Sequence, residues 1–145
     1  MAVKTYSFSD TVLTLSHPSL GQLSTNGMGM GNINISMRTD RSQIDVAADG
    51  TPVVSKIKDQ TGTMSLSVQQ ISDLHTSLKR WFNYLENADA SEWALIKAVL
   101  TSKQTGEQDV MTGGSITKHA DKTFEQTAGN VTWNFLFANI VQNNI

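Results

Sequence analysis

Alternating glycine and methionine residues make Gly27-Met-Gly-Met-Gly31 the segment of the chain closest in composition to a ligand-binding motif. A phosphate-binding loop would need Gly-Lys-Ser/Thr at the start of a helix, or a dinucleotide fingerprint between a strand and a helix. Here the glycines precede a strand-like segment and no lysine follows. We therefore interpret the segment as a loop in which glycine permits positive φ or close backbone approach, and in which Met28 and Met30 suit an adaptable contact with another protein.

Other residues that could catalyse a reaction or bind a metal are not grouped at useful spacings. The three histidines are widely separated and have no partner at metal-ligand spacing: His17, His75 and His119. Asp40, Asp45 and Asp49 precede Gly50, but the alternate ligands and terminal glutamate of an EF-hand are missing. No Gly-x-Ser-x-Gly motif occurs, and no pair of carboxylates stands out. We therefore expect no enzyme, no metal and no cofactor, and histidines that are exposed or half-buried.

The composition bounds the class of protein. The chain has 145 residues, no cysteine and a formal net charge of -2. This length suits one domain, residues 1–145, with a core that needs no disulfide. Without cysteine, the chain has no thiolate metal site and no cysteine nucleophile. The lack of a basic stripe argues against a sequence-specific nucleic-acid binder.

Charged residues are only 17% of the chain, against a typical value of about 25%. Since charge is depleted at the cores of protein interfaces, this composition suits a protein that is largely covered by other protein. The N-terminus lacks the basic and apolar regions of a signal peptide. The longest apolar runs, near residues 93–100 and 131–141, are too short to span a bilayer. We expect no secretion signal and no membrane insertion.

Two segments with strict apolar and polar alternation define the expected fold. In residues 63–69, Met64, Leu66 and Val68 alternate with small uncharged polar residues, and residues 32–38 repeat this pattern. Because side chains alternate between the faces of a strand, each segment predicts a strand with one face on a core and the other toward water. Further strands are predicted at residues 4–9, 11–16, 44–47 and 52–58, and residues 17–31 are expected to form a loop. Residues 44–47 are expected to pair with residues 32–38 as a hairpin, and residues 49–50 to form a tight turn.

The hydrophobic period changes after these strands. Apolar residues at spacings of three and four, from Ile71 to Leu85, predict one helix over residues 72–87, with Ser72 as the N-cap. The last third returns to strands at residues 93–100 (buried on both faces), 109–112, 115–119 and 130–141, although the apolar run at residues 93–100 also fits a helix. Six aromatic residues on apolar stripes are assigned to the core: Trp81, Phe82, Trp93, Trp133, Phe135 and Phe137. The pattern indicates a mainly β fold, a β sandwich or barrel with one amphipathic α-helix.

Several short strings occur in a characteristic order: Tyr6-Ser-Phe8, the glycine loop, Ile33-Asn-Ile-Ser-Met37, Arg41-Ser-Gln-Ile-Asp-Val-Ala-Ala-Asp-Gly50, Gly62-Thr-Met-Ser-Leu-Ser-Val68 and Val131-Thr-Trp-Asn-Phe135. This order resembles the small tail tube proteins of contractile-tailed bacteriophages, which are related to the tube proteins of type VI secretion and pyocin particles. The resemblance covers nearly the whole chain. It rests on a pattern of strands and short strings rather than on catalytic residues.

The resemblance implies a hexameric ring in which each subunit adds about four strands to one closed inter-subunit β-barrel. Rings would stack into a hollow tube that conducts DNA into the host cell, with a contractile sheath around it and the helix outside the barrel. Tape measure and baseplate proteins would be further partners. The protein would then belong to the virion tail and be assembled in the bacterial host cytoplasm.

A polar, uncharged lumen would let DNA slide, whereas a strongly basic one would bind its phosphates tightly. We therefore expect the polar faces of residues 32–38, 43–47 and 61–69 to line the lumen, including Asn34, Ser36, Arg38, Thr63, Ser65, Ser67 and Gln69. Contacts between subunits or rings are expected at the glycine loop and two later segments: Met28, Met30, Asp40, Arg41, Asp49 and Val53.

Two other functions fit the same pattern. One is the tube of a type VI secretion or pyocin-like contractile injection particle, where the cargo is protein. The other is a monomeric ligand-binding β sandwich, which predicts a discrete monomer with exposed aromatic residues. Within the tube interpretation, the polar faces could also be reversed and meet the sheath instead of the lumen.

Overall fold

Residues 3–25 and 30–144 are described in the computed structural model of the chain. Within them the backbone forms one α-helix, α1 (Asp73–Asn87), and short 3₁₀ helices at Phe8–Asp10 and Ala90–Glu92. The strands are β1 (Thr11–His17), β2 (Gly21–Thr25), β3 (Met30–Met37), β4 (Ser42–Val46), β5 (Pro52–Lys56), β6 (Gly62–Gln69), β7 (Ile96–Ser102), β8 (Glu107–Ile116) and β9 (Asn130–Asn144).

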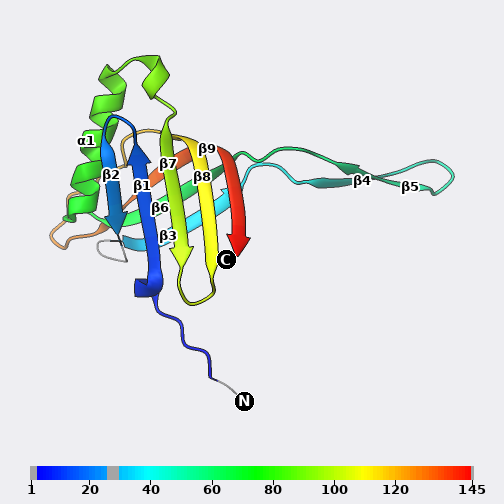
Figure 1. The fold of residues 1–145 in the computed structure, drawn as a ribbon, viewed down its shortest axis with the longest axis horizontal. Helices are drawn as coiled ribbons and strands as arrows, with labels where there is room; N and C mark the ends of the chain where they lie inside the picture. Colours follow the sequence, from blue (N-terminus) through cyan, green and yellow to red (C-terminus); the bar gives the residue numbers. More distant parts are fainter. Residues whose placement is uncertain (1–2, 26–29, 145) are drawn as a thin grey trace.

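Seven strands form one antiparallel sheet in the order β2-β1-β7-β8-β9-β6-β3, while β4 and β5 pair only with each other. The sheet curls, so that β6 and β3 cross behind β1, β7 and β8 (Figure 1). Strands from distant places in the sheet order therefore meet, and Thr11, Ile33 and Leu100 line one pocket. This architecture confirms the expected mainly β fold with one helix. The barrel is not closed within one chain, since the edge strands β2 and β3 do not pair in the described residues.

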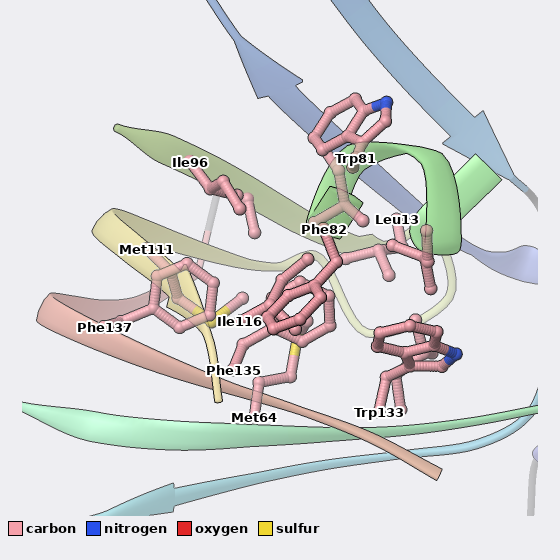
Figure 2. Packing of buried hydrophobic residues seen from close by; sticks show 14 of the residues in the cluster. Leu13, Met64, Trp81, Phe82, Ile96, Met111, Ile116, Trp133, Phe135 and Phe137 are labelled. Atoms are coloured by element: carbon pink, nitrogen blue, oxygen red, sulfur yellow. The ribbon is translucent and has the colours of Figure 1, made fainter. Parts of the chain in front are cut away.

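The core fills the inside of the curled sheet. Met64 of β6 and Trp133 and Phe135 of β9 are excluded from solvent, and they belong to one buried cluster with Trp81 and Phe82 of α1 (Figure 2). Most of the aromatic residues assigned to the core are thus buried as predicted; Trp93 is only half-buried and packs against the edge of the cluster. The stability of the body therefore rests on apolar burial between the curled sheet and α1.

The helix forms where the period of three and four predicts it. The Ser72 hydroxyl accepts a hydrogen bond from the His75 N–H at 3.3 Å, which is the N-cap contact of the first turn. Leu78 and Leu85 are buried on one face of α1, whereas Ile71 precedes the helix and is exposed. In the part of the chain that the structure describes, no helix is both long enough and apolar enough to cross a membrane.

Two predictions near the N-terminus are wrong. Residues 4–9 form no strand, and a 3₁₀ turn covers Phe8–Asp10 instead. Residues 17–31 are not a continuous loop, because β2 folds back on β1 after a turn and pairs Leu15 with Leu23. Gly21 begins this strand with a φ of 89°, a conformation that favours glycine. Gly21, predicted to lie in a loop, therefore lies at the end of a hairpin turn.

The predicted pairing of residues 32–38 with the next strand is also wrong. β3 pairs instead with β6, with Ile35 opposite Met64, and β4 pairs with β5. The apolar face of β3 packs against the core, which only a strand of the main sheet can supply. The turn residues after residue 38 do not decide which strand β3 pairs with. Pairing with β4 would bury less apolar surface than pairing with β6 does.

The strands of the last third differ from the prediction at their ends. A 3₁₀ turn at Ala90–Glu92 delays β7 until Ile96, and Lys97 is exposed, so this strand is not buried on both faces. The two short strands predicted between residues 109 and 119 are one strand, β8, whose pairing with β7 shifts register near Gly113. Gly113 has a φ of 65°, which accommodates the irregularity.

The expected exposure of two histidines is wrong. His17 and His75 are both buried. The His17 ring bonds at Nε2 to the Glu92 carbonyl at 2.9 Å and at Nδ1 to the Ser19 N–H at 3.1 Å. His75 Nδ1 accepts from the Trp133 indole N–H at 3.0 Å. These hydrogen bonds offset the cost of removing a polar ring from water.

Candidate assembly surfaces

Small polar side chains cover the outer face of β9, β6 and β3. Because these strands pair in register, their side chains form rows: Asn34, Ser65 and Asn134 in one row, and Asn32, Ser67 and Thr132 in the next. The Ser65 hydroxyl donates to the Asn134 side-chain oxygen at 2.8 Å. The alternate residues of the same strands point into the core. The three strands therefore present one uncharged polar face, called the polar face below.

The structure brings most of the expected lumen residues onto this face: Asn34, Ser36, Thr63, Ser65, Ser67 and Gln69. Arg38 lies just beyond the end of β3, where its N–H donates to the Thr61 carbonyl at 3.1 Å and its charge helps to lower the pKa of Asp59. Residues 43–47 do not join the polar face, because β4 lies in the separate hairpin.

The sequence reasoning missed the contribution of β9. Thr132 and Asn134 continue the rows of the polar face, and Leu136 lies opposite Thr63 with 47% of its surface exposed. The signal was present in the sequence: the buried residues at 131, 133, 135 and 137 require the even-numbered ones between them to face outward. Leu136 is an apolar residue on this outward side, and it stays about half exposed in the single chain.

A second surface is the hairpin of β4 and β5, which projects away from the sheet and helix (Figure 1). Every residue of both strands is exposed. Ile44 pairs with Val54, and both keep about two-thirds of their surface in water, at 65% and 64%. An isolated two-stranded hairpin is only marginally stable in water. An exposed apolar stripe on such a hairpin indicates a surface that another protein covers.

The turn of the hairpin is well defined. The Gly50 N–H donates to the Ala47 carbonyl at 2.9 Å, and Gly50 has a φ of 89°. This geometry confirms the tight turn predicted at residues 49–50. The Asp49 carboxylate accepts from the Thr51 N–H at 3.0 Å, and this hydrogen bond lowers the pKa of Asp49. The turn therefore presents a carboxylate that stays charged.

A hydrogen-bond network around Asp59 lies where the hairpin leaves the sheet. The Thr39 hydroxyl donates to Asp59 Oδ2 at 2.6 Å, and the Thr61 N–H donates to Oδ1 at 2.9 Å. Led by the bond from Thr39, these contacts hold the pKa of Asp59 well below its usual range. On the hairpin side of this network, the Arg41 carbonyl accepts from the Ile57 N–H at 2.8 Å. The two chain segments are thus tied together at the base.

Most of the residues expected at contacts between subunits lie on or near this hairpin. Asp49 is in its turn, Val53 is in β5, and Asp40 and Arg41 are at its base. Met30 begins β3, where its backbone pairs with Val68, and Met28 lies outside the described residues.

One protein-family model matches nearly all of the chain. The family described as bacteriophage PhiTE tail tube protein matches residues 3–143. None of the curated protein sequences compared with the chain matches it.

Three solved structures share the fold at low sequence identity. A chain of the anti-feeding prophage (AFP) baseplate has a TM-score of 0.66 and 6% identity, over 99% of this chain and 98% of that chain. A chain of the AFP tube-terminating cap has a TM-score of 0.62 and 7% identity, over 100% and 95%. A chain of the sheath-tube complex of an extracellular contractile injection system, PVC, has a TM-score of 0.55 and 8% identity, over 92% and 88%.

The structural likenesses show the fold, and the family match spans nearly the whole chain. The chain therefore belongs to the bacteriophage PhiTE tail tube protein family.

Proposed function

We propose that this chain is the structural subunit of a phage tail tube. In this proposal residues 1–145 form one tube-type domain, six copies form a ring, and rings stack into a hollow tube inside a contractile sheath. The observation that carries the proposal is the fully exposed, partly apolar β4–β5 hairpin, which needs another protein to cover it. Membership of the tail tube family supports further copies of the same chain as its neighbours.

The polar face is proposed as the lumen wall. Its side chains on β3, β6 and β9 are neutral, so they offer a polyanion hydrogen-bonding groups without phosphate-binding charge. A formal charge of -2 per subunit, taken six times, gives -12 per ring, which is mildly repulsive to DNA. Both properties favour DNA that moves through the tube without binding to it. We expect no catalytic activity in this role.

The proposed partners follow from that assembly. They are further copies of the chain, a sheath protein on the outside, and tape measure and baseplate proteins at the end where the tube begins. The proposed location is the virion tail, assembled in the host cytoplasm. β2 and β3 are edge strands of the sheet, and pairing them between subunits would close the barrel and remove the exposed edges.

Negative-stain electron microscopy of the purified protein, with its mass in solution, tests the proposal. Rings or hollow tubes are the expected result. A monomer that remains single at high concentration and with baseplate and tape measure proteins added would refute it and favour the ligand-binding sandwich. Exposed aromatic residues such as Tyr6 and Phe124 would then be the first binding candidates.

Single cysteines at Ser65 and Ser67 test the lumen assignment, because the chain has no cysteine of its own. In assembled tubes, bulky thiol reagents should label these positions far more slowly than a cysteine at the exposed helix residue Glu86. Free labelling by bulky reagents would instead place the polar face on the outside, against the sheath.

A second candidate is the tube of a contractile injection particle that delivers protein. The shared fold with AFP and PVC chains favours it as an alternative. The two candidates predict different surroundings: capsid genes and DNA-filled particles for a phage, and capsid-free particles in the culture medium for an injection system.

A further inference from the structure

A cleft with a volume of about 390 Å³ lies between α1 and the segment that precedes β9. The helix contributes His75, Thr76 and Lys79, and the segment contributes Lys122 and Phe124. Two lysine side chains therefore reach the same cleft from different parts of the chain. Glu125, which also lines it, is the one acidic residue among the lining.

A buried imidazole forms part of the wall of this cleft. His75 is only 3% exposed, and its Nδ1 accepts the hydrogen bond of the Trp133 indole at 3.0 Å. An indole nitrogen can only donate, so the neutral ring must carry its proton on Nε2. Nε2 has no hydrogen-bond partner among the described residues and is not sealed from solvent. The cleft is thus lined by two lysines and by an imidazole whose N–H has no partner among the described residues.

The rim of the cleft is apolar. Ile71 and Phe124 keep 79% and 85% of their surface exposed, although both are large apolar side chains. The N–H donor, the two lysines and this rim together fit a ligand that combines a carboxylate with apolar side chains. An acidic protein segment of mixed polarity has that chemistry.

The turn of the β4–β5 hairpin has the complementary chemistry. Residues 42–55 include Asp45 and Asp49 and contain no lysine or arginine. Ile44, Val46 and Val54 on the same hairpin are exposed. Since the five residues of β4 each rise about 3.3 Å, the turn lies roughly 15–20 Å beyond the base of the hairpin. At this distance, the main sheet of the same chain cannot cover the turn of the hairpin.

The hairpin and α1 lie at opposite ends of the molecule (Figure 1). A contact between surfaces at opposite ends of one chain joins copies head to tail, and such contacts repeat in rings or in stacked arrays. The hairpin of one copy and the cleft of the next could therefore form one head-to-tail contact that repeats from copy to copy.

We propose that the turn of the β4–β5 hairpin of one copy docks into the cleft between α1 and residues 122–128 of a second copy. Asp49 would face Lys79, Lys122 and the Nε2–H of His75. The apolar side chains of the hairpin would pack on Ile71 and Phe124. This inference rests on the proposed tube function and names one of its contacts between copies.

Disulfide trapping in the otherwise cysteine-free chain tests the contact. Ala48→Cys in the turn and Thr127→Cys in the cleft leave all the charged groups in place. An oxidised mixture of the two single variants, one carrying a mass tag, should give mixed dimers. A mixture of Ala48→Cys with Asn134→Cys, which lies on the polar face, should give far fewer.

Charge reversal provides the second measurement. Lys79→Glu with Lys122→Glu should raise the protein concentration needed for assembly about tenfold, and adding Asp45→Lys with Asp49→Lys should restore much of the loss. Lys97→Glu, at an exposed position on β7, is the matched control. Circular dichroism establishes that each variant is folded.

The outcomes separate this inference from the proposed function. Tubes without the mixed dimer, or with unchanged assembly after charge reversal, would overturn the contact and leave the tube role standing. The mixed dimer without rings or tubes would support the contact and overturn the tube role. If neither mixed dimers nor rings and tubes form, both the contact and the tube role are overturned.

Discussion

The body of the molecule and the β4–β5 hairpin show two opposite uses of apolar residues. In the body, Trp133 and Phe135 lie inside the curled sheet, with almost no surface in water. In the hairpin, Ile44 and Val54 also lie in paired antiparallel strands, but no second layer of the described residues covers them. The comparison teaches that the body buries its own apolar residues, whereas the hairpin leaves its apolar residues in water in the single chain.

The largest expected effect is in the core of the body. Phe135→Ala should lower the free energy of unfolding by about 3–5 kcal/mol, because the removed ring leaves a cavity between β9 and its neighbours. Urea denaturation of the unassembled protein measures this. A loss below about 1 kcal/mol would mean that the core is loosely packed, and would weaken the contrast with the hairpin.

The next effect concerns the buried histidine. Trp133→Phe leaves His75 Nδ1 without its donor and should cost about 1–3 kcal/mol at neutral pH. Burial lowers the pKa of His75, as do the charges of Lys79, Lys122 and His119.

The lowered pKa of His75 also has a consequence for stability as a function of pH. Below about pH 6.5 the unfolded ring takes up a proton that the folded ring resists. Because the unfolded state then binds more protons, stability should fall as the pH falls through this range until the folded ring also protonates. Denaturation at a series of pH values checks this. The fall should be smaller in Trp133→Phe, and an equal fall would show that the indole does not contribute.

A smaller effect is expected at the junction between the two regions. Asp59→Asn removes charge-assisted hydrogen bonds from Thr39 and Thr61, so the amide protons near the base of the hairpin should exchange faster. Exchange in β6 and β9 should be unchanged. Asp121→Asn, at an exposed carboxylate outside the junction, serves as the control. Faster exchange throughout the sheet would show that the network supports the body as well.

The smallest effect on folding, and a large one on assembly, is expected in the hairpin. Ile44→Asp with Val54→Asp should change the free energy of unfolding by less than about 0.5 kcal/mol, because both side chains are already in water. The same variant should fail to form tubes. Gln43→Asp with Ser55→Asp, a cross-strand pair of polar residues on the same hairpin, adds the same charge and should assemble better. Normal tubes from the first variant would contradict the assembly role.

Much of the local structure could be predicted because it depends on neighbours in the sequence. Alternation at residues 63–69 identified β6 and the side chains of its two faces, and Ser72 marked the start of α1. The turn at Gly50 followed from its residue types. Element boundaries were wrong near Gly21 and Gly113, and also at residues 4–9 and at the start of β7, where 3₁₀ turns replace part or all of a predicted strand.

The candidate surfaces could be predicted only in part. The polar face was visible strand by strand, but its third strand was not, because pairing between β6 and β9 joins residues more than sixty positions apart in the chain. The isolation of the hairpin was also hidden. Ile44 and Val54 have the same apolar character as core residues, and nothing local distinguishes a strand that is covered by its own chain from one that is not.

By itself, the sequence determined the faces of the strands, the helix with its cap, and the uncharged character of the polar side chains, since these depend on residue type and period. Tertiary structure alone decided that β3 pairs with β6, that β4 and β5 stand apart, and that Lys122 meets Lys79 across one cleft. The physical reason is that burial of apolar surface depends on the whole chain at once. A strand takes the partner that gives the collective core its least exposed surface, and no local pattern contains that choice.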